Sequence, residues 1–186
     1  MLTSAQKEQH RQQGYLIVEN LLTEEECEAL NQRACDIVEE RVPLGEGIQI
    51  HLEPEAENRG LVSQENKYEY LFKIGYRLHE TDSVFRSFVS HPQIVAALKE
   101  LVGPDVKCIQ TMYIDKSPHL GIGQPFHQDS NYLQTDPDTL LGLWLALDDV
   151  DIANGCLHVI PGSQSETIHP HESPIDPAQR AYHYHE

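Results

Sequence analysis

Basic residues are scarce in this sequence. Its 186 residues include 13 Lys and Arg against 30 Asp and Glu, a formal net charge of -17. Such an acidic chain repels phosphate backbones, so we expect no nucleic-acid partner. Long apolar runs are missing too, and the N-terminus has no basic-then-apolar leader. The sequence therefore predicts neither a membrane span nor a secretory signal.

Paired cysteines are also lacking. None of the four cysteines forms a C-x-x-C, which speaks against a zinc knuckle or a thioredoxin-like redox site; they are Cys27, Cys35, Cys108 and Cys156. We expect reduced thiols and a cytoplasmic location. Cys108 and Cys156 stand in apolar runs, which predicts small core residues.

The first half of the chain has the signals of helices. Capping boxes at Thr3 and Thr23 predict one helix to about residue 13 and a longer one that ends at Pro43. Ser90 with Pro92 predicts a further helix that stops at Gly103. Residues 43–66 are expected to form a loop or lid, and residues 68–76 are either strand or irregular.

The second half has the pattern of strands. Alternating or continuous apolar runs predict strands at 15–18, 106–114, 126–133, 140–147 and 156–160, with residues 140–147 buried. Because helices come first and strands follow, we expect one α+β domain with a β-sandwich or barrel in its second half.

A histidine and a carboxylate stand two residues apart in Pro125-Phe126-His127-Gln128-Asp129. On an extended backbone, residues i and i+2 point to the same side, so His127 and Asp129 can converge on one cation. Such a pair begins the 2-His-1-carboxylate site of non-haem Fe(II) oxygenases. The alternative is a plain His–Asp pair on a polar strand face.

Several blocks along the chain share one resemblance. They are residues 14–18, the His127-x-Asp129 segment, residues 142–149 and residues 154–163. Together they resemble the phytanoyl-CoA dioxygenase (PhyH) family of Fe(II)/2-oxoglutarate-dependent oxygenases, over about residues 8–164. The resemblance implies a double-stranded β-helix, a cupin-like jelly roll, with N-terminal helices. It divides the domain into a mainly helical part (1–104), jelly-roll strands (105–164) and an irregular tail (165–186).

The resemblance also implies a chemistry. The chain would be an oxidoreductase that hydroxylates a small organic substrate, lipid-like or a secondary metabolite, with Fe(II) and 2-oxoglutarate as cofactors and ascorbate as a reductant. His127 and Asp129 would bind the metal, with no catalytic residue beyond the metal site. Lys73, Met112 and Trp144 would bind 2-oxoglutarate. The plainer alternatives are an exposed lysine, a core methionine and a tryptophan buried in a strand. Further pocket residues would be Tyr113, Gln128, Asn131 and Tyr132.

The tail departs from the family pattern. The family has a second histidine ligand and an arginine for 2-oxoglutarate on later strands, and no segment after Ser163 matches them. Weak candidates are His171, His183, His185 and Arg180. Either the chain stops before the sandwich closes, or an internal deletion has brought the distal motif forward to His171. Three prolines after residue 169 favour the first reading, because proline is excluded from central strands.

Three functions therefore stay open at the level of the sequence. The first is an active dioxygenase. The second is a truncated, catalytically impaired family member with a partial metal site. The third is a cupin-type metal-binding protein of another class. The sequence identifies neither the substrate nor the oligomeric state.

Overall fold

Two capping boxes begin the first two helices, as the sequence predicts. The computed structural model describes residues 2–171, in which α1 spans Ser4–Gln13 and α2 spans Glu24–Val38. The hydroxyls of Thr3 and Thr23 each accept a hydrogen bond from the backbone three residues on. Helix α2 ends before Pro43, because Glu40 has a left-handed backbone with φ 59°.

The stretch predicted as a loop contains the edge of a sheet. Strand β1 (Gln49–Leu52) pairs antiparallel with β2 (Leu71–Gly75), and β2 pairs antiparallel with β3 (Tyr113–Ile114). A short helix α3 (Pro54–Asn58) and the 3-10 helix η1 (Lys67–Tyr70) lie between β1 and β2. The expectation of a loop or lid at residues 43–66 was wrong for the part that forms β1 and α3. A four-residue strand has little pattern of its own and forms through its partner.

Three more helices follow β2, namely α4 (Leu78–Thr81), α5 (Ser83–Val89) and α6 (Pro92–Val102). Asp82 caps α5 with one carboxylate oxygen, while the other binds Arg33 of α2 at 2.6 Å. The predicted cap at Ser90 is wrong, because its hydroxyl donates back to the carbonyl of Arg86, and His91 is the N-cap of α6.

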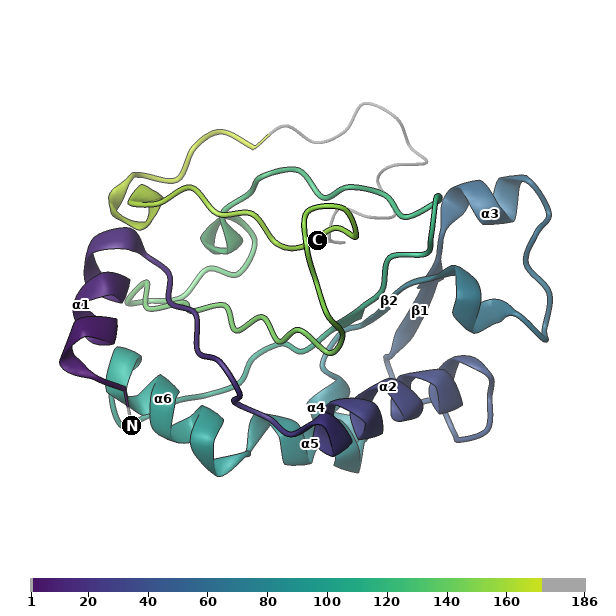
Figure 1. Ribbon diagram of the computed structural model, residues 1–186, viewed down its shortest axis with the longest axis horizontal. Helices are drawn as coiled ribbons and strands as arrows, with labels where there is room; N and C mark the ends of the chain where they lie inside the picture. The colour runs from purple at the N-terminus through teal and green to yellow at the C-terminus, as the bar shows by residue number, and fades with distance from the viewer. Residues whose placement is uncertain (1, 172–186) are drawn as a thin grey trace.

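The core lies between α2 and one face of the sheet. The buried side of α2 (Leu30, Ala34, Ile37 and Val38) packs with Ile74 and Tyr113 of the sheet and with Leu78 and Phe85 of α4 and α5. In Figure 1, α2, α4, α5 and α6 run along one side of the molecule, and the second half of the chain crosses above them in long irregular segments.

No strand other than β3 lies between residues 105 and 171. The strands predicted at 126–133, 140–147 and 156–160 are irregular, and so are residues 15–18. Leu143 is 44% and Trp144 47% exposed, so residues 140–147 are not a buried strand. Cys108 and Cys156 are half-buried and not core residues. An apolar run becomes a buried strand only when neighbouring strands pair with its backbone, and residues 2–171 offer these runs no such partner.

The observed fold is thus a set of helices around a small antiparallel sheet, which agrees with the α+β class. The jelly roll itself is not formed by strands in residues 2–171. Within this range, no helix has both the length and the apolar character needed to cross a bilayer.

Candidate metal centre

His127 and Asp129 point at each other in the structure. The distance from His127 Nε2 to Asp129 Oδ1 is 3.3 Å. Two ligands at right angles on one cation, with metal bonds of about 2.1 Å, stand about 3.0 Å apart. The pair is therefore spaced as two neighbouring ligands of one metal ion, and imidazole with carboxylate is a donor set that suits Fe(II).

A backbone carbonyl orients the His127 ring. His127 Nδ1 lies 2.9 Å from the carbonyl oxygen of Pro125, so Nδ1 donates and Nε2 has the free lone pair in the neutral ring. The hydrogen bond with Asp129 raises the pKa of His127, and burial acts in the opposite direction. A proton and a metal cation thus compete for the same pair of atoms.

The local backbone explains the convergence. Gln128 is extended, with φ −114° and ψ 122°, although Asp129 already begins the 3-10 helix η2 (Asp129–Asn131). A Cβ placed on Gly142 would lie 3.5 Å from Asp129 Oδ2, so Gly142 lies beside this carboxylate. Trp144, two residues further on, is half exposed, which contradicts the alternative of a tryptophan buried in a strand.

Gln128 holds residues 167–171 beside the His127–Asp129 pair. Its backbone N–H donates to His171 Nε2 at 2.8 Å, and its Oε1 accepts from the backbone N–H of His169 at 2.8 Å. Its Nε2 lies 3.5 Å from the carbonyl oxygen of Thr167. One residue between the two predicted ligands thus docks residues 167–171.

This docking decides what His171 does. Its Nε2 accepts from Gln128 and its Nδ1 donates to the carbonyl of His169 at 2.7 Å, so both ring nitrogens are engaged. Tyr132 contacts the rings of both His127 and His171 edge-on, at 6.1 and 5.6 Å between centroids. No group of three potential metal ligands exists within residues 2–171. His183, His185 and Arg180 lie outside the described residues.

Replacing Gln128 by alanine is expected to loosen residues 167–171. The variant loses the acceptor for the His169 N–H, and one hydrogen bond of about 1 kcal/mol corresponds to roughly a fivefold faster amide exchange. Hydrogen–deuterium exchange of peptides over 165–171 measures this. The exposed Gln124→Ala is the matched control, and equal exchange in both variants would contradict the docking role.

Lys73, on β2, is one of the most buried charged residues in the described chain. Its exposed fraction is 3%, which contradicts the alternative of a solvent-exposed lysine. Burial lowers the pKa of its ammonium group. Met112 lies against the same strand, since its Cγ would be 3.5 Å from a Cβ placed on Gly75. Tyr113 points to the opposite, core side, where its hydroxyl bonds Tyr68 and Asn31.

Sequence reasoning missed Glu53. Its side chain is fully buried just after β1, and neither carboxylate oxygen has a hydrogen bond of good geometry within the described chain. Burial raises the pKa of Glu53 to about 7, and the nearby Asp115 adds to this rise. The backbone N–H of Ile122 and the Lys116 ammonium lower it only in part. No sequence signal marks Glu53, because it stands in the stretch that predicts a loop.

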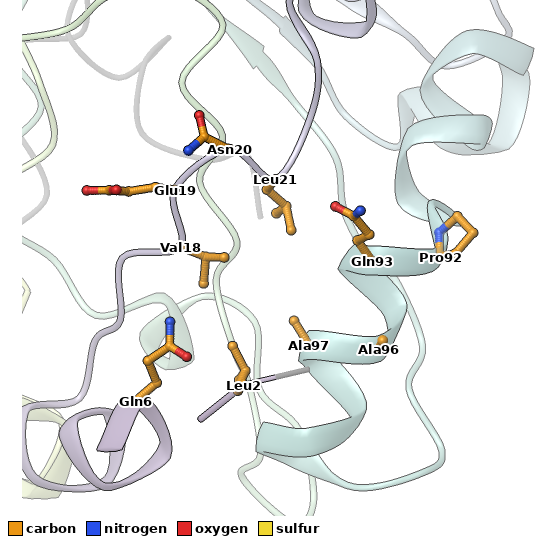
Figure 2. A pocket seen from close by; sticks show the side chains of 10 residues that line it. All are labelled: Leu2, Gln6, Val18, Glu19, Asn20, Leu21, Pro92, Gln93, Ala96 and Ala97. Carbon is orange, nitrogen blue, oxygen red and sulfur yellow. The ribbon is translucent and has the colours of Figure 1, made fainter. Parts of the chain in front are cut away.

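A surface hollow lies away from the His127–Asp129 pair. It has a volume of ≈ 410 Å³ and lies between the start of α1, residues 18–21 and the face of α6 that contains Ala96 and Ala97 (Figure 2). None of the predicted site residues lines it, so it does not support a role in the metal chemistry.

Comparison with known proteins decides the family. A sequence profile described as "Phytanoyl-CoA dioxygenase (PhyH)" matches residues 10–184. The chain belongs to the phytanoyl-CoA dioxygenase family. This match extends beyond residue 164, where the sequence blocks quoted for the resemblance end. It excludes the third hypothesis, a cupin-type metal-binding protein of another class.

Individual PhyH-family relatives agree with this. Phytanoyl-CoA dioxygenase domain-containing protein 1 of Mus musculus is 32% identical over 195 residues, which cover 90% of this chain and 67% of the relative. Phytanoyl-CoA dioxygenase 1 of Oryza sativa subsp. japonica is 31% identical over 175 residues, covering 83% of this chain and 62% of the relative. The chain thus spans about two thirds of these relatives. Members of this family are generally Fe(II)/2-oxoglutarate-dependent dioxygenases.

Proposed function

We propose that this protein is a non-haem Fe(II)/2-oxoglutarate-dependent dioxygenase that hydroxylates a small organic substrate, lipid-like or a secondary metabolite. The observation that supports this best is the 3.3 Å approach of His127 Nε2 to Asp129 Oδ1, with Nδ1 held by the Pro125 carbonyl. Because Nδ1 is hydrogen-bonded to this carbonyl, Nε2 is the nitrogen of the neutral ring that can bind a metal next to Asp129.

The residues take the following roles in this proposal. His127 and Asp129 are two metal ligands, and Lys73, Met112 and Trp144 bind 2-oxoglutarate. Bound iron supplies oxygen activation, coupled to the decarboxylation of 2-oxoglutarate, which yields hydroxylated product, succinate and CO2. The carbonyl of Pro125 orients the ring of His127. Lys73 supplies a buried cation, and Met112 places its apolar thioether beside β2.

The proposal extends to the architecture and the location of the protein. The irregular segments between residues 105 and 164 belong to a jelly roll that the helical part (1–104) supports, and residues 165–186 form its tail. The partner is a small molecule and not a nucleic acid or a membrane, in line with the net charge of -17. The four free cysteines support a cytoplasmic location.

Turnover of 2-oxoglutarate tests the function without knowledge of the substrate. The purified chain is incubated with Fe(II), ascorbate, O2 and 2-oxoglutarate, and succinate is quantified. Metal-dependent succinate above the level of a His127→Ala variant supports the proposal. Succinate at the level of that variant, despite bound metal, contradicts it.

One observation favours a second candidate, a catalytically impaired member with a partial metal site. Within residues 2–171, His127 and Asp129 have no third His, Cys, Asp or Glu that completes a metal site. Such a protein binds a divalent metal weakly and turns over poorly unless another ligand completes the site. Weak metal binding without succinate formation selects this candidate, and tight binding with turnover rejects it.

A further inference from the structure

Residues 162–171 connect the end of α1 to the His127–Asp129 pair. The backbone N–H of Gly162 donates to the carbonyl of Gln13 at 2.9 Å, and the side-chain amide of Gln164 donates to the carbonyl of Arg11 at 3.1 Å. In Figure 1 this yellow-green segment passes beside α1 and then continues to the end of the described chain. One end of the segment is thus fixed on the last turn of a helix.

The other end of the segment holds the residue between the two predicted ligands. The backbone N–H of Gln128 belongs to the peptide group that joins it to His127, and it donates to His171 Nε2 at 2.8 Å. The side-chain oxygen of Gln128 accepts from the backbone N–H of His169 at 2.8 Å. The extended backbone of Gln128 is what turns His127 and Asp129 to one side. A contact that fixes this peptide group therefore fixes the relative direction of the two side chains.

The hydrogen bonds of His171 define the state of its ring. Its Nδ1 lies 2.7 Å from the carbonyl oxygen of His169, and a carbonyl only accepts, so Nδ1 has the proton of the neutral ring. Nε2 then offers its lone pair to the N–H of Gln128. The ring of Tyr132 contacts the rings of both His171 and His127 edge-on. A lone pair that is used in this way is not available to a metal ion, so His171 acts on the metal pair through its neighbours.

We propose that His171 is a positioning residue of the metal site, which accepts from the Gln128 N–H and so fixes the peptide group between His127 and Asp129. This rests on the proposed function, because it needs these two residues to bind the metal. Partners that orient metal ligands are worth about 10–100-fold in metal affinity. His171 holds the backbone between the ligands and not a ligand ring, so its effect should lie at the lower end of this range.

The test compares two substitutions of His171 that separate the acceptor from the ring. His171→Phe keeps a ring beside Tyr132 and removes the acceptor. His171→Gln removes the ring and keeps an acceptor, because the glutamine oxygen is as many bonds from Cα as Nε2 of histidine. The affinity for Mn(II) is measured by calorimetry in the absence of O2. We expect about tenfold weaker binding in His171→Phe and binding within about twofold of wild type in His171→Gln. Amide exchange over residues 125–131 should rise only in His171→Phe.

His169→Ala is the matched control, since it removes an exposed imidazole from the same segment and keeps the backbone N–H that Gln128 accepts. It should bind Mn(II) as the wild type does. If His171→Phe has wild-type affinity, or if His171→Gln loses as much as His171→Phe, the inference fails while the proposed function stands. The inference also fails if His171→Phe loses as much affinity as His127→Ala, since His171 would then be a ligand itself. If the wild-type chain binds no Mn(II), the proposed function fails and the inference with it.

Discussion

Replacing His127 by alanine is expected to lower the affinity of the chain for Fe(II) or Mn(II) at least 100-fold. The change removes one of two ligands whose donor atoms stand 3.3 Å apart. Loss of a hydrogen-bond partner of a metal ligand typically costs 10–100-fold in affinity, so loss of the ligand itself costs more. Calorimetry with Mn(II), or its electron paramagnetic resonance signal, measures the affinity. Asp129→Ala should lower the metal affinity to a similar extent.

His158→Ala is the matched control, because His158 is an exposed histidine outside the pair. It should bind metal as the wild type does. A His127→Ala variant that binds metal with wild-type affinity would show that other residues hold the ion. It would contradict the assignment of His127 as a metal ligand. Thermal unfolding of each variant without metal separates loss of a ligand from loss of the fold.

Replacing Glu53 by glutamine is expected to stabilise the protein at pH 8 and to change little at pH 4. Glutamine keeps the shape of the side chain and removes an ionisable group that is fully buried. The pKa of Glu53 rises from 4.5 to about 7 in the folded protein, which corresponds to about 3 kcal/mol in the free energy of unfolding.

The sign follows from the protons that each state binds. Between pH 4.5 and about 7 the folded state keeps a proton on Glu53 that the unfolded state has released, so the stability contributed at low pH is lost as the pH rises through this window. The glutamine variant has no such loss. Urea unfolding at pH 4, 6 and 8 measures the difference between the variants.

Glu57→Gln is the control, since Glu57 is an exposed residue of the same helix α3. The Glu57→Gln variant loses an exposed carboxylate and not a buried one. The difference in its free energy of unfolding from wild type should therefore barely depend on pH. If Glu53→Gln follows the same course as Glu57→Gln, the carboxyl of Glu53 is not desolvated in solution.

Much of the helical part was open to prediction. In the sheet, β3 lies at the end of the strand predicted at 106–114 and β2 lies in the segment read as strand or irregular, whereas β1 was not predicted. The caps at Thr3 and Thr23 and the stop at Gly14 use neighbouring residues only, so local sequence predicts them. Strand β1 is four residues long and pairs with a strand some twenty residues away. Apolar runs such as residues 140–147 predicted strands that are not present, because a strand depends on backbone partners supplied from elsewhere.

The sequence by itself determined that the side chains of His127 and Asp129 lie close together, since their geometry depends on one extended residue between them. Only the tertiary structure decided the surroundings. The burial of Lys73 beside Tyr76, the desolvated carboxyl of Glu53 and the docking of residues 167–171 by Gln128 each depend on how distant parts of the chain cover or touch one another. Exposure and hydrogen-bond partners are properties of the packed chain, and residue type alone does not encode them.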